Sequence, residues 1–487
     1  TVTMWKYLIA VLAMLAVAPK PSDIYLYVMG PEEAQKCLKK LPRRDEPRLP
    51  IPVEVNAANR PYDLLVYGAT GFTGKLCAEY LSHHPDVTSG RVRVGLGGRS
   101  EKKLKKLKQS LGKAGENFGI EVADSGNTTQ ILRLVRTTTA IITTVGPYTK
   151  YGTILVEVCS QLGVHYADLS GEPLWQRKMI DDWDKTAKEL GSRIIVAAGY
   201  DSAPFDLGTF AALDYAERFL SGGPKDVTAV VHTMRGMASG GTIASAMQSV
   251  PKNESEMRQM MDPYLLKGRH AVGCELDKYD VSGWGLWPRY DFTTGAFGVM
   301  HFMAPINARI VRRSMALLKY AAPYAEGITL YALLDWFTFF LNEYLKGGLS
   351  IFPAPGEGPP ERTMRNGRVR LQVVATTDKG EKATVHLSFP GDPGYLATSR
   401  MISEAGLCLA IKECRDLPQM TDKVSTAGSR GGVHTPASGL GLPLLERYVR
   451  NGVASMKVTT TDENGVETVR PALKIHPYTP PKTDEYI

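Results

Sequence analysis

Three glycines near residue 70 have the spacing of a phosphate-binding turn. Gly68, Gly71 and Gly74 stand three residues apart in the run GATGFTG. In such a turn the first glycine permits a sharp bend, the second lets the backbone approach a diphosphate, and the third lets a helix pack closely on the preceding strand. Amide hydrogens at the start of that helix would neutralise the phosphates. The run therefore predicts a dinucleotide site, and the alternative is a glycine-rich turn that holds no ligand.

The segments on either side of this run have the periodicity of a strand and a helix. Residues 63–67 (DLLVY) are an apolar run of strand length, and Phe72, Leu76 and Tyr80 recur every four residues, as on one face of a helix. Further apolar runs alternate with segments of helical spacing. This indicates an α/β fold with a doubly wound parallel sheet of the Rossmann type, which binds ligands at the carboxyl ends of its strands. The other expected strands are 91–96, 119–124, 140–145, 164–169 and 193–198, and the expected helices are 101–111, 128–135, 152–162 and 173–190.

The residues after the second expected strand bear on the identity of the dinucleotide. An NAD site usually places a carboxylate there to bond the ribose hydroxyls, but this chain has Gly97, Gly98, Arg99 and Ser100. The Arg99 guanidinium could bond a 2′-phosphate through two parallel hydrogen bonds, so NADP(H) is favoured over NAD(H). The alternative is an exposed surface arginine that binds no ligand.

Two further strand ends complete the predicted cofactor site. The run after the fourth strand should lie under the nicotinamide and its ribose, and the end of the third strand could reach the adenine edge. The predicted cofactor-binding residues are Gly68, Ala69, Thr70, Gly71, Phe72, Thr73, Gly74, Arg99, Ser100, Asp124, Val145, Gly146, Pro147 and Tyr148.

The spacing of polar residues identifies no catalytic group. Hydride transfer often needs a proton donor, but no candidate stands in a pattern that dictates a mechanism, and no Y-x-x-x-K pair occurs where a short-chain dehydrogenase has one. We expect Tyr148 and Tyr200 to line the substrate cleft and His165 to be a structural strand residue. No cysteine pair has the spacing of zinc ligands, so no metal is expected. The candidates near the strand ends are Tyr148, Tyr151, His165, Asp168, Glu172, Tyr200 and Asp201.

After residue 205 the alternation of strands and helices is lost. Residues 227–233 predict a strand, and 367–389 predict a β-hairpin around the turn-forming run Asp378-Lys379-Gly380. A helix expected at 395–411 would return to the Rossmann domain and make that domain discontinuous. We therefore expect three regions, namely an N-terminal extension at 1–61, a Rossmann domain at 62–205 completed by 395–450, and a mixed α+β substrate or interaction domain at 206–394.

Two apolar segments could contact a membrane or a partner. Residues 7–18 (YLIAVLAMLAVA) are too short to span a bilayer, which takes roughly 20 residues. They fit a cleavable signal, a membrane-surface anchor or a helix packed on a partner, and a proline-rich charged arm follows at 19–61. Residues 328–345 are dense in aromatics but contain Asp335 and Glu343, which predicts either a lipid-facing surface helix or a buried interface helix.

Composition sets broad limits on the function. The chain has 487 residues, of which 43% are hydrophobic and 22% charged, and its net charge is +8; this is ordinary globular usage. The basic cluster at 102–108 has the pattern of a solvated helix face, so nucleic acid is not an expected partner. The six cysteines form no C-x-x-C pair and suit a reducing compartment.

Seven segments, in chain order, carry a family resemblance. They are YDLLVYGATGFTG (62–74), GGRS (97–100), TTVGPYTKYG (143–152), YADLSGE (166–172), AAGYDSAPFDLG (197–208), GDPGYLATSRMISEA (391–405) and GGVHTPASG (431–439). Together they resemble the saccharopine dehydrogenase-like oxidoreductase family, which includes an animal lipid-droplet-associated member and mycobacterial trans-acting enoyl reductases. The match is weak between about 250 and 360. The resemblance implies that Gly68, Gly71 and Gly74 hold a nicotinamide cofactor used to reduce a lipophilic substrate, and it carries over no catalytic residue.

Two functions from different classes fit these observations. The first is an NADP(H)-binding oxidoreductase that acts on a hydrophobic or lipid-like substrate. The second is a non-catalytic accessory subunit of an organellar membrane complex, such as a mitochondrial respiratory complex, that keeps a nucleotide-binding Rossmann domain. The expected partners are a nicotinamide dinucleotide together with a lipid or membrane surface, or a large membrane protein assembly. The expected location is an organelle membrane, with the mitochondrion favoured and a lipid droplet or the endoplasmic reticulum as the alternative.

Overall fold

The computed structural model describes residues 60–236, 253–267, 284–285, 287–345, 358–416 and 431–471. The apolar segment predicted at 7–18 and nearly all of the arm at 19–61 lie outside the described residues. Within the ranges given above, no helix combines the length and the apolar character needed to cross a membrane.

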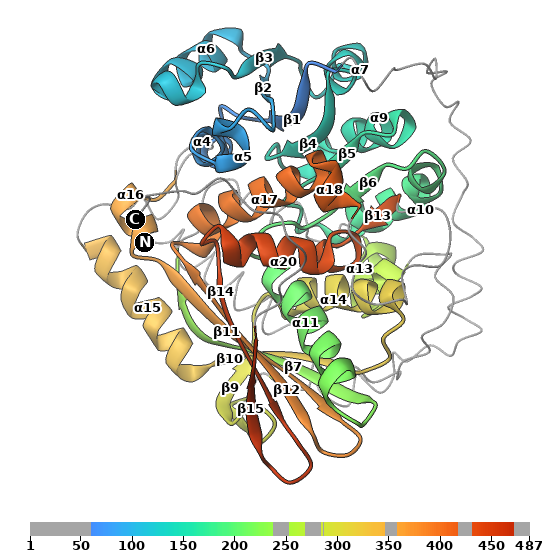
Figure 1. The fold of residues 1–487 in the computed structure, drawn as a ribbon, viewed down its shortest axis with the longest axis vertical. Helices are drawn as coiled ribbons and strands as arrows, with labels where there is room; N and C mark the ends of the chain where they lie inside the picture. Colours follow the sequence, from blue (N-terminus) through green and yellow to red (C-terminus); the bar gives the residue numbers. More distant parts are fainter. Residues whose placement is uncertain are drawn as a thin grey trace. The chain divides into compact units, whose positions relative to one another are not determined.

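A parallel sheet of seven strands forms the first half of the fold (Figure 1). Its order is β13-β6-β5-β4-β1-β2-β3, and every neighbouring pair is parallel. The direction of winding reverses between β1 and β4, which is where doubly wound sheets bind their ligands. The strands are β1 (Tyr62–Tyr67), β2 (Val94–Gly98), β3 (Gly119–Val122), β4 (Thr138–Thr143), β5 (His165–Ala167), β6 (Arg193–Ile195) and β13 (Gly432–His434).

Six of these strands confirm the sequence prediction, with ends that differ by a few residues. β2 begins at Val94 rather than at residue 91, because its pairing with β1 starts where Val94 lies opposite Leu64. β13 was not predicted: it joins the sheet beside β6 from more than 230 residues further along the chain, and three residues are too few to show a period.

Helices follow the strands of this sheet and begin and end at residue types that commonly cap helices. Ser100 accepts a hydrogen bond from the backbone at the start of α6, and Asn127 does the same for α7. Gly163 ends α9 with a φ of 63°, a left-handed conformation that glycine adopts without strain. The helices are α4 (Phe72–Ser82), α5 (Pro85–Thr88), α6 (Glu101–Ser110), α7 (Thr128–Val135), α8 (Tyr148–Tyr151), α9 (Thr153–Leu162) and α10 (Pro173–Glu189).

A mixed sheet of eight strands forms the second half. Its order is β15-β14-β12-β11-β7-β10-β9-β8, and only β7 and β10 pair in parallel. The predicted hairpin is confirmed as β11 and β12, and Gly380 takes a φ of 80° in its turn. The strands are β7 (Pro224–Arg235), β8 (Arg289–Asp291), β9 (Ala296–Met300), β10 (Tyr324–Thr329), β11 (Arg368–Thr377), β12 (Lys382–Pro390), β14 (Ser455–Thr461) and β15 (Glu467–Arg470).

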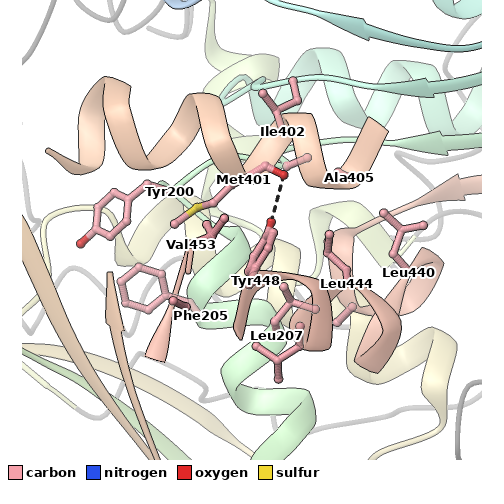
Figure 2. Packing of buried hydrophobic residues seen from close by; sticks show 14 of the residues in the cluster. Tyr200, Phe205, Leu207, Met401, Ile402, Ala405, Leu440, Leu444, Tyr448 and Val453 are labelled. Carbon is pink, nitrogen blue, oxygen red and sulfur yellow. Dashed lines mark hydrogen bonds between the residues drawn. The ribbon is translucent and has the colours of Figure 1, made fainter. Parts of the chain in front are cut away.

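A buried apolar cluster joins the two sheets. Helix α11 (Ala203–Phe219) packs on β11 and β12, while α17 (Thr398–Ala410) returns to pack on α4, β4 and β5. Figure 2 shows side chains from α11, α17 and α20 (Gly441–Arg450) meeting in this cluster, where the Tyr448 hydroxyl donates to the Met401 carbonyl at 3.3 Å. The remaining helical segments of the described residues are α13 (Glu254–Met261), α14 (Ala304–Leu318), α15 (Leu330–Leu345), α16 (Glu361–Arg365), α18 (Lys412–Arg415), α19 (Pro436–Gly439), two 3-10 helices, η2 (Gly112–Gly115) and η3 (Leu265–Lys267), and a π-helical turn, η4 (Pro393–Ala397).

Helix α15 packs on the fold by one face and exposes the other, so a lipid-facing surface helix and an interface helix both stay predictions for residues 328–345. Residues 328–329 end β10, and the helix begins at Leu330. One face packs on β7, where Asp335 forms an ion pair with Arg235 at 2.7 Å. The helix is therefore only partly buried. Its opposite face exposes the apolar side chains of Tyr331, Leu334, Phe337, Leu341, Tyr344 and Leu345.

Candidate functional site

The predicted glycine turn has the geometry that close approach to a diphosphate requires. Gly68 has a φ of 85°, a conformation that residues with a Cβ rarely adopt, and the Gly71 amide donates to the Gly68 carbonyl at 2.9 Å. A Cβ on Gly74 would lie 2.2 Å from that same carbonyl oxygen, so only glycine allows α4 to sit so near the turn. Gly68 and Gly74 therefore have the turn and packing roles that the sequence predicted, and the approach of Gly71 to a diphosphate stays a prediction.

The first turn of α4 suits an anion. Gly71 is its N-cap and provides no side-chain hydrogen bond, and the first turn contains no acidic residue. The helix thus begins with amide hydrogens that no capping side chain accepts and with a dipole that no carboxylate compensates. These features fit the diphosphate of a dinucleotide.

The loops after β1 and β4 are in contact, as the cofactor prediction requires. A Cβ on Gly68 would lie 2.7 Å from Val145 Cγ2, and the Thr144 hydroxyl donates to the Gly68 carbonyl at 3.3 Å. In the same loop, the peptide bond between Gly146 and Pro147 is cis. The structure therefore brings the glycine turn and the start of the 145–148 run together at the point where the sheet reverses its order.

Arg99 and Asp124 lie near one another at the ends of β2 and β3. Arg99 is exposed. Burial raises the pKa of Tyr67 to about 12; the Asp124 charge adds to the shift and the Arg99 charge opposes it, so both charges act on the same phenol. Asp124 accepts a hydrogen bond from the Gly126 amide at 2.8 Å, and Ser100 caps α6. Arg99 is thus an exposed guanidinium at the end of β2.

Tyr148 has a structural role that the sequence did not indicate. Its hydroxyl donates to the Thr143 carbonyl and accepts from the Leu169 amide, both at 3.1 Å, so it links the ends of β4 and β5. Burial, together with the Asp168 charge, raises the pKa of Tyr148 well above its usual value. These bonds disfavour Tyr148 as a proton donor, and its position under the nicotinamide stays a prediction.

Other polar candidates from the strand ends also hold the backbone. Glu172 accepts from the amides of Tyr148 and Thr149, both at 2.7 Å. The Asp168 carboxylate accepts from the Ala197 amide at 2.9 Å, and its burial raises its pKa to about 6. His165 Nδ1 accepts from the Arg193 amide at 3.1 Å, which agrees with the structural role expected for it. None of these groups is left unpaired to act on a substrate.

A polar cluster that sequence reasoning only partly found lies beyond the end of β6. Tyr200 and Asp201 were candidates, but His301 and Glu326, which lie close to them, were missed. His301 Nδ1 lies 2.6 Å from the Glu326 carboxylate, and the Asp201 carboxyl interacts electrostatically with His301. His301 is about 100 residues from Tyr200 in sequence, in a stretch with no motif, so no local signal could have linked them.

Comparisons with known proteins place these motifs in one family. Residues 64–195 match the family model described as the saccharopine dehydrogenase NADP binding domain. A putative trans-acting enoyl reductase of Mycobacterium tuberculosis is 34% identical over 429 residues, covering 82% of this chain and 98% of that protein. A trans-acting enoyl reductase of Mycobacterium bovis is 31% identical over 432 residues, with the same coverage.

Solved structures also align along most of the chain. The apo form of saccharopine dehydrogenase (L-Glu forming) from Saccharomyces cerevisiae aligns with 82% of this chain and 100% of that chain, at 12% identity and a TM-score of 0.46.

Proposed function

The chain belongs to the saccharopine dehydrogenase-like oxidoreductase family, and from this premise we propose that it uses NADPH to reduce the carbon–carbon double bond of a lipid-like enoyl substrate. Its relatives over 82% of the chain are named as enoyl reductases. The family model over 64–195 is that of an NADP-binding domain. Membership of this family supports enoyl reduction as the reaction and a lipid-like acyl group as the substrate class.

The observation that carries the proposal is the start of α4. An uncapped helix N-terminus begins at the three-glycine turn, and an exposed arginine stands at the end of the neighbouring strand. The helix end would bind the diphosphate, and Arg99 would bind the 2′-phosphate that distinguishes NADPH from NADH. When bound, the reduced nicotinamide supplies the hydride, and the protein orients it against the substrate.

The experiment measures binding and turnover separately. Fluorescence titration of the full chain with NADPH and NADH should give a lower dissociation constant for NADPH. NADPH consumption should then depend on an added α,β-unsaturated thioester, such as dodecenoyl pantetheine, and product analysis should show the saturated acyl group. NADPH binding without consumption for any chain length of enoyl thioester would contradict the proposed reaction.

The alternative of an accessory subunit depends on a part of the chain outside the described residues. Its main support in the sequence is the segment at 7–18 and the arm at 19–61. No described contact favours it, so it remains a prediction of the sequence, as do the mitochondrial and lipid-droplet locations.

A further inference from the structure

Two buried polar atoms at the junction of the two sheets are not used by the cofactor site. Among the described residues, the Tyr200 hydroxyl and the Nε2 atom of His301 are buried and have no hydrogen-bond partner. The two side chains are only 5% and 0% exposed. Because a buried polar atom without a partner is costly, most such atoms in native proteins are paired. The pair therefore points to a bound group that completes these bonds.

The imidazole of His301 is held in one orientation by a buried carboxylate. His301 Nδ1 lies 2.6 Å from Glu326 Oε1, and the same oxygen accepts from Asn307 Nδ2 at 2.9 Å. The Tyr324 hydroxyl donates to the other carboxylate oxygen at 2.9 Å. With Nδ1 committed to Glu326, Nε2 is the ring atom left to meet a ligand.

The two unpartnered groups contact the same phenylalanine. The Phe205 ring centroid is 6.2 Å from that of Tyr200 and 5.4 Å from that of His301, and the His301 ring is stacked on it. Figure 2 shows Tyr200 beside Phe205, with its hydroxyl directed away from the cluster around Tyr448. Tyr200 also interacts electrostatically with Asp201 and Glu326, so both unpartnered atoms belong to one polar cluster.

The turn η4 connects this cluster to the predicted cofactor site. The Tyr200 amide donates to the Thr398 hydroxyl at 3.0 Å. Tyr395, three residues before Thr398, packs its ring edge-on against Phe72 of the glycine turn, with centroids 5.0 Å apart. The η4 turn and Thr398 therefore lie between Tyr200 and the residues that begin α4.

A line of aromatic rings leads from His301 toward the surface. Successive ring centroids are 4.6 Å apart between His301 and Phe302, 6.5 Å between Phe302 and Trp336, 6.2 Å between Trp336 and Phe340, and 6.4 Å between Phe340 and Tyr344. Phe302 is 50% and Tyr344 39% exposed. The rings thus form a row of partly exposed apolar side chains that begins beside the buried His301.

We propose that Tyr200 and His301 bind the carbonyl oxygen of an acyl substrate, and that the line Phe302, Trp336, Phe340 and Tyr344 binds its apolar chain. The inference rests on the proposed reductase function and names the residues that act on its substrate. One occupant, an acyl group with a long hydrocarbon chain, matches both the polar end and the apolar length of this surface.

Reduction of the enoyl group requires a hydride at the β carbon and a proton at the α carbon. The nicotinamide supplies the hydride and is thereby oxidised. As the hydride adds, the electron pair of the double bond moves to the carbonyl oxygen, which becomes an enolate. His301 Nε2 delivers a proton to that oxygen while Nδ1 stays bonded to Glu326, and Tyr200 donates a hydrogen bond. The enol rearranges to the saturated acyl group, and His301 regains a proton from water.

The apolar part of the proposal is tested by binding alone. Calorimetry with the NADP-loaded full chain and saturated butanoyl, octanoyl and dodecanoyl pantetheine thioesters should show affinity that rises about two- to fourfold per added methylene. Phe340→Ala should weaken dodecanoyl binding roughly tenfold and leave butanoyl binding unchanged. The matched control is Phe337→Ala, because Phe337 is 56% exposed on the same helix and lies outside the line.

The polar part is tested by turnover. Tyr200→Phe and His301→Gln should each lower kcat for dodecenoyl pantetheine about a hundredfold, while the NADPH dissociation constant stays unchanged. Tyr448→Phe is the control, since it also removes a buried hydroxyl, one bonded to Met401. Unchanged NADPH binding shows that a variant is folded, and Tyr200→Phe removes a single oxygen atom.

The outcomes separate this inference from the proposed function. Chain-length-dependent binding by a protein that never consumes NADPH would support the acyl site and contradict the reductase. An active reductase in which Phe340→Ala behaves like Phe337→Ala, or in which Tyr200→Phe and His301→Gln keep the full rate, would overturn the inference. A wild-type chain that binds none of the thioesters would overturn it as well.

Discussion

Arg99 offers the most direct test of the cofactor at the scale of single residues. We expect Arg99→Ala to weaken NADPH binding roughly tenfold and to leave NADH binding nearly unchanged, because an exposed guanidinium–phosphate pair contributes about 1–2 kcal/mol. Fluorescence titrations with both cofactors give the two dissociation constants.

Arg93→Ala is the matched control for this change. Arg93 is exposed, lies near the other end of the same strand, and pairs with Asp63 at 2.9 Å. The control should leave both dissociation constants unchanged. Equal losses for NADPH and NADH in the Arg99 variant would mean that the side chain does not contact the 2′-phosphate.

Tyr148 and Tyr200 show why residue types alone did not separate structural from chemical roles. Both tyrosines follow a strand, and both were expected in the substrate cleft. In the fold, the Tyr148 hydroxyl bonds two backbone groups, whereas the Tyr200 hydroxyl is buried without a partner among the described residues. The difference depends on which neighbouring strand each phenol reaches, and no local spacing encodes that.

At the scale of elements, the start of α4 depends on close packing at Gly74. Gly74→Ala would place a Cβ 2.2 Å from the Gly68 carbonyl oxygen and 2.8 Å from Ala69 Cα, so the turn must move. We expect the free energy of unfolding to fall by about 1–3 kcal/mol and NADPH binding to be lost, because the amide hydrogens no longer converge on the diphosphate. Urea denaturation and NADPH titration measure the two effects.

Gly223→Ala is a suitable control for the Gly74 variant. The nearest atom to its added Cβ is 3.9 Å away, and Gly223 lies directly before β7 of the second sheet, away from the glycine turn. It should bind NADPH normally. If Gly74→Ala binds NADPH as well as this control does, the glycine turn does not position the phosphates.

The elements that the sequence predicted well are those specified by local signals. The glycine turn, the Asn127 cap and the Gly163 stop each depend on a few consecutive residues. β13 and the His301–Glu326 pair depend on contacts between distant segments, and β13 is too short to show a period. The alternation of strand and helix predicted the sheet, but it could not predict which distant residues complete that sheet and its polar cluster.

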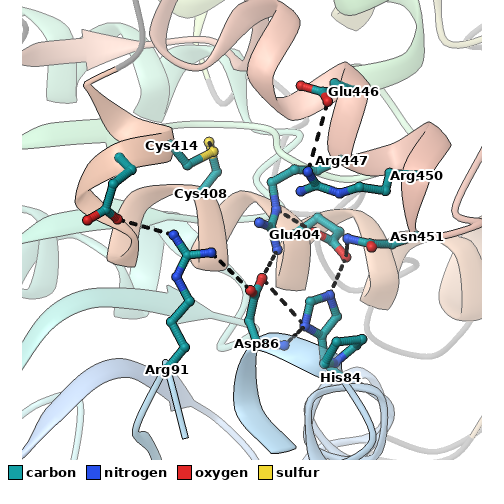
Figure 3. Close-up of polar contacts among 12 residues, drawn as sticks. His84, Asp86, Arg91, Glu404, Cys408, Cys414, Glu446, Arg447, Arg450 and Asn451 are labelled. Carbon is teal, nitrogen blue, oxygen red and sulfur yellow. Dashed lines mark hydrogen bonds and ion pairs between the residues drawn. The ribbon is translucent and has the colours of Figure 1, made fainter. Parts of the chain in front are cut away.

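At the scale of the whole molecule, a buried ionic network joins residues from opposite ends of the described chain (Figure 3). Glu404 on α17 accepts from Arg447 Nε at 2.7 Å and lies 3.0 Å from His84 Nε2. Arg447 also bonds Asp86 at 2.8 Å. Each side chain is almost wholly buried, so removing one charge leaves its partners buried and unpaired. The network thus connects the segment after α4 to α17 and α20.

This network should set the response of the fold to acid. Although burial by itself would raise the pKa of Glu404, Arg447 and His84 outweigh it and hold that pKa well below its usual value. A depressed carboxyl pKa adds stability that is fully present above the unfolded-state value of about 4.3 and is lost as pH falls toward the folded-state value. Asp206 acts in the opposite direction, since burial raises its pKa to about 7 and the stability it contributes declines as pH rises from about 4 toward 7.

Glu404→Gln separates these two contributions. We expect the variant to lose about 3–5 kcal/mol of unfolding free energy at neutral pH, because Arg447 is left buried without its full charge partner. It should also lose less stability than the wild type on acidification below about pH 4, since the carboxylate that would be protonated is gone. Urea denaturation across a series of pH values measures both. Glu413→Gln, at a site 76% exposed and paired with Arg91, should change neither; an acid response of Glu404→Gln that matches the wild type would show that other carboxylates govern the acid limit of the fold.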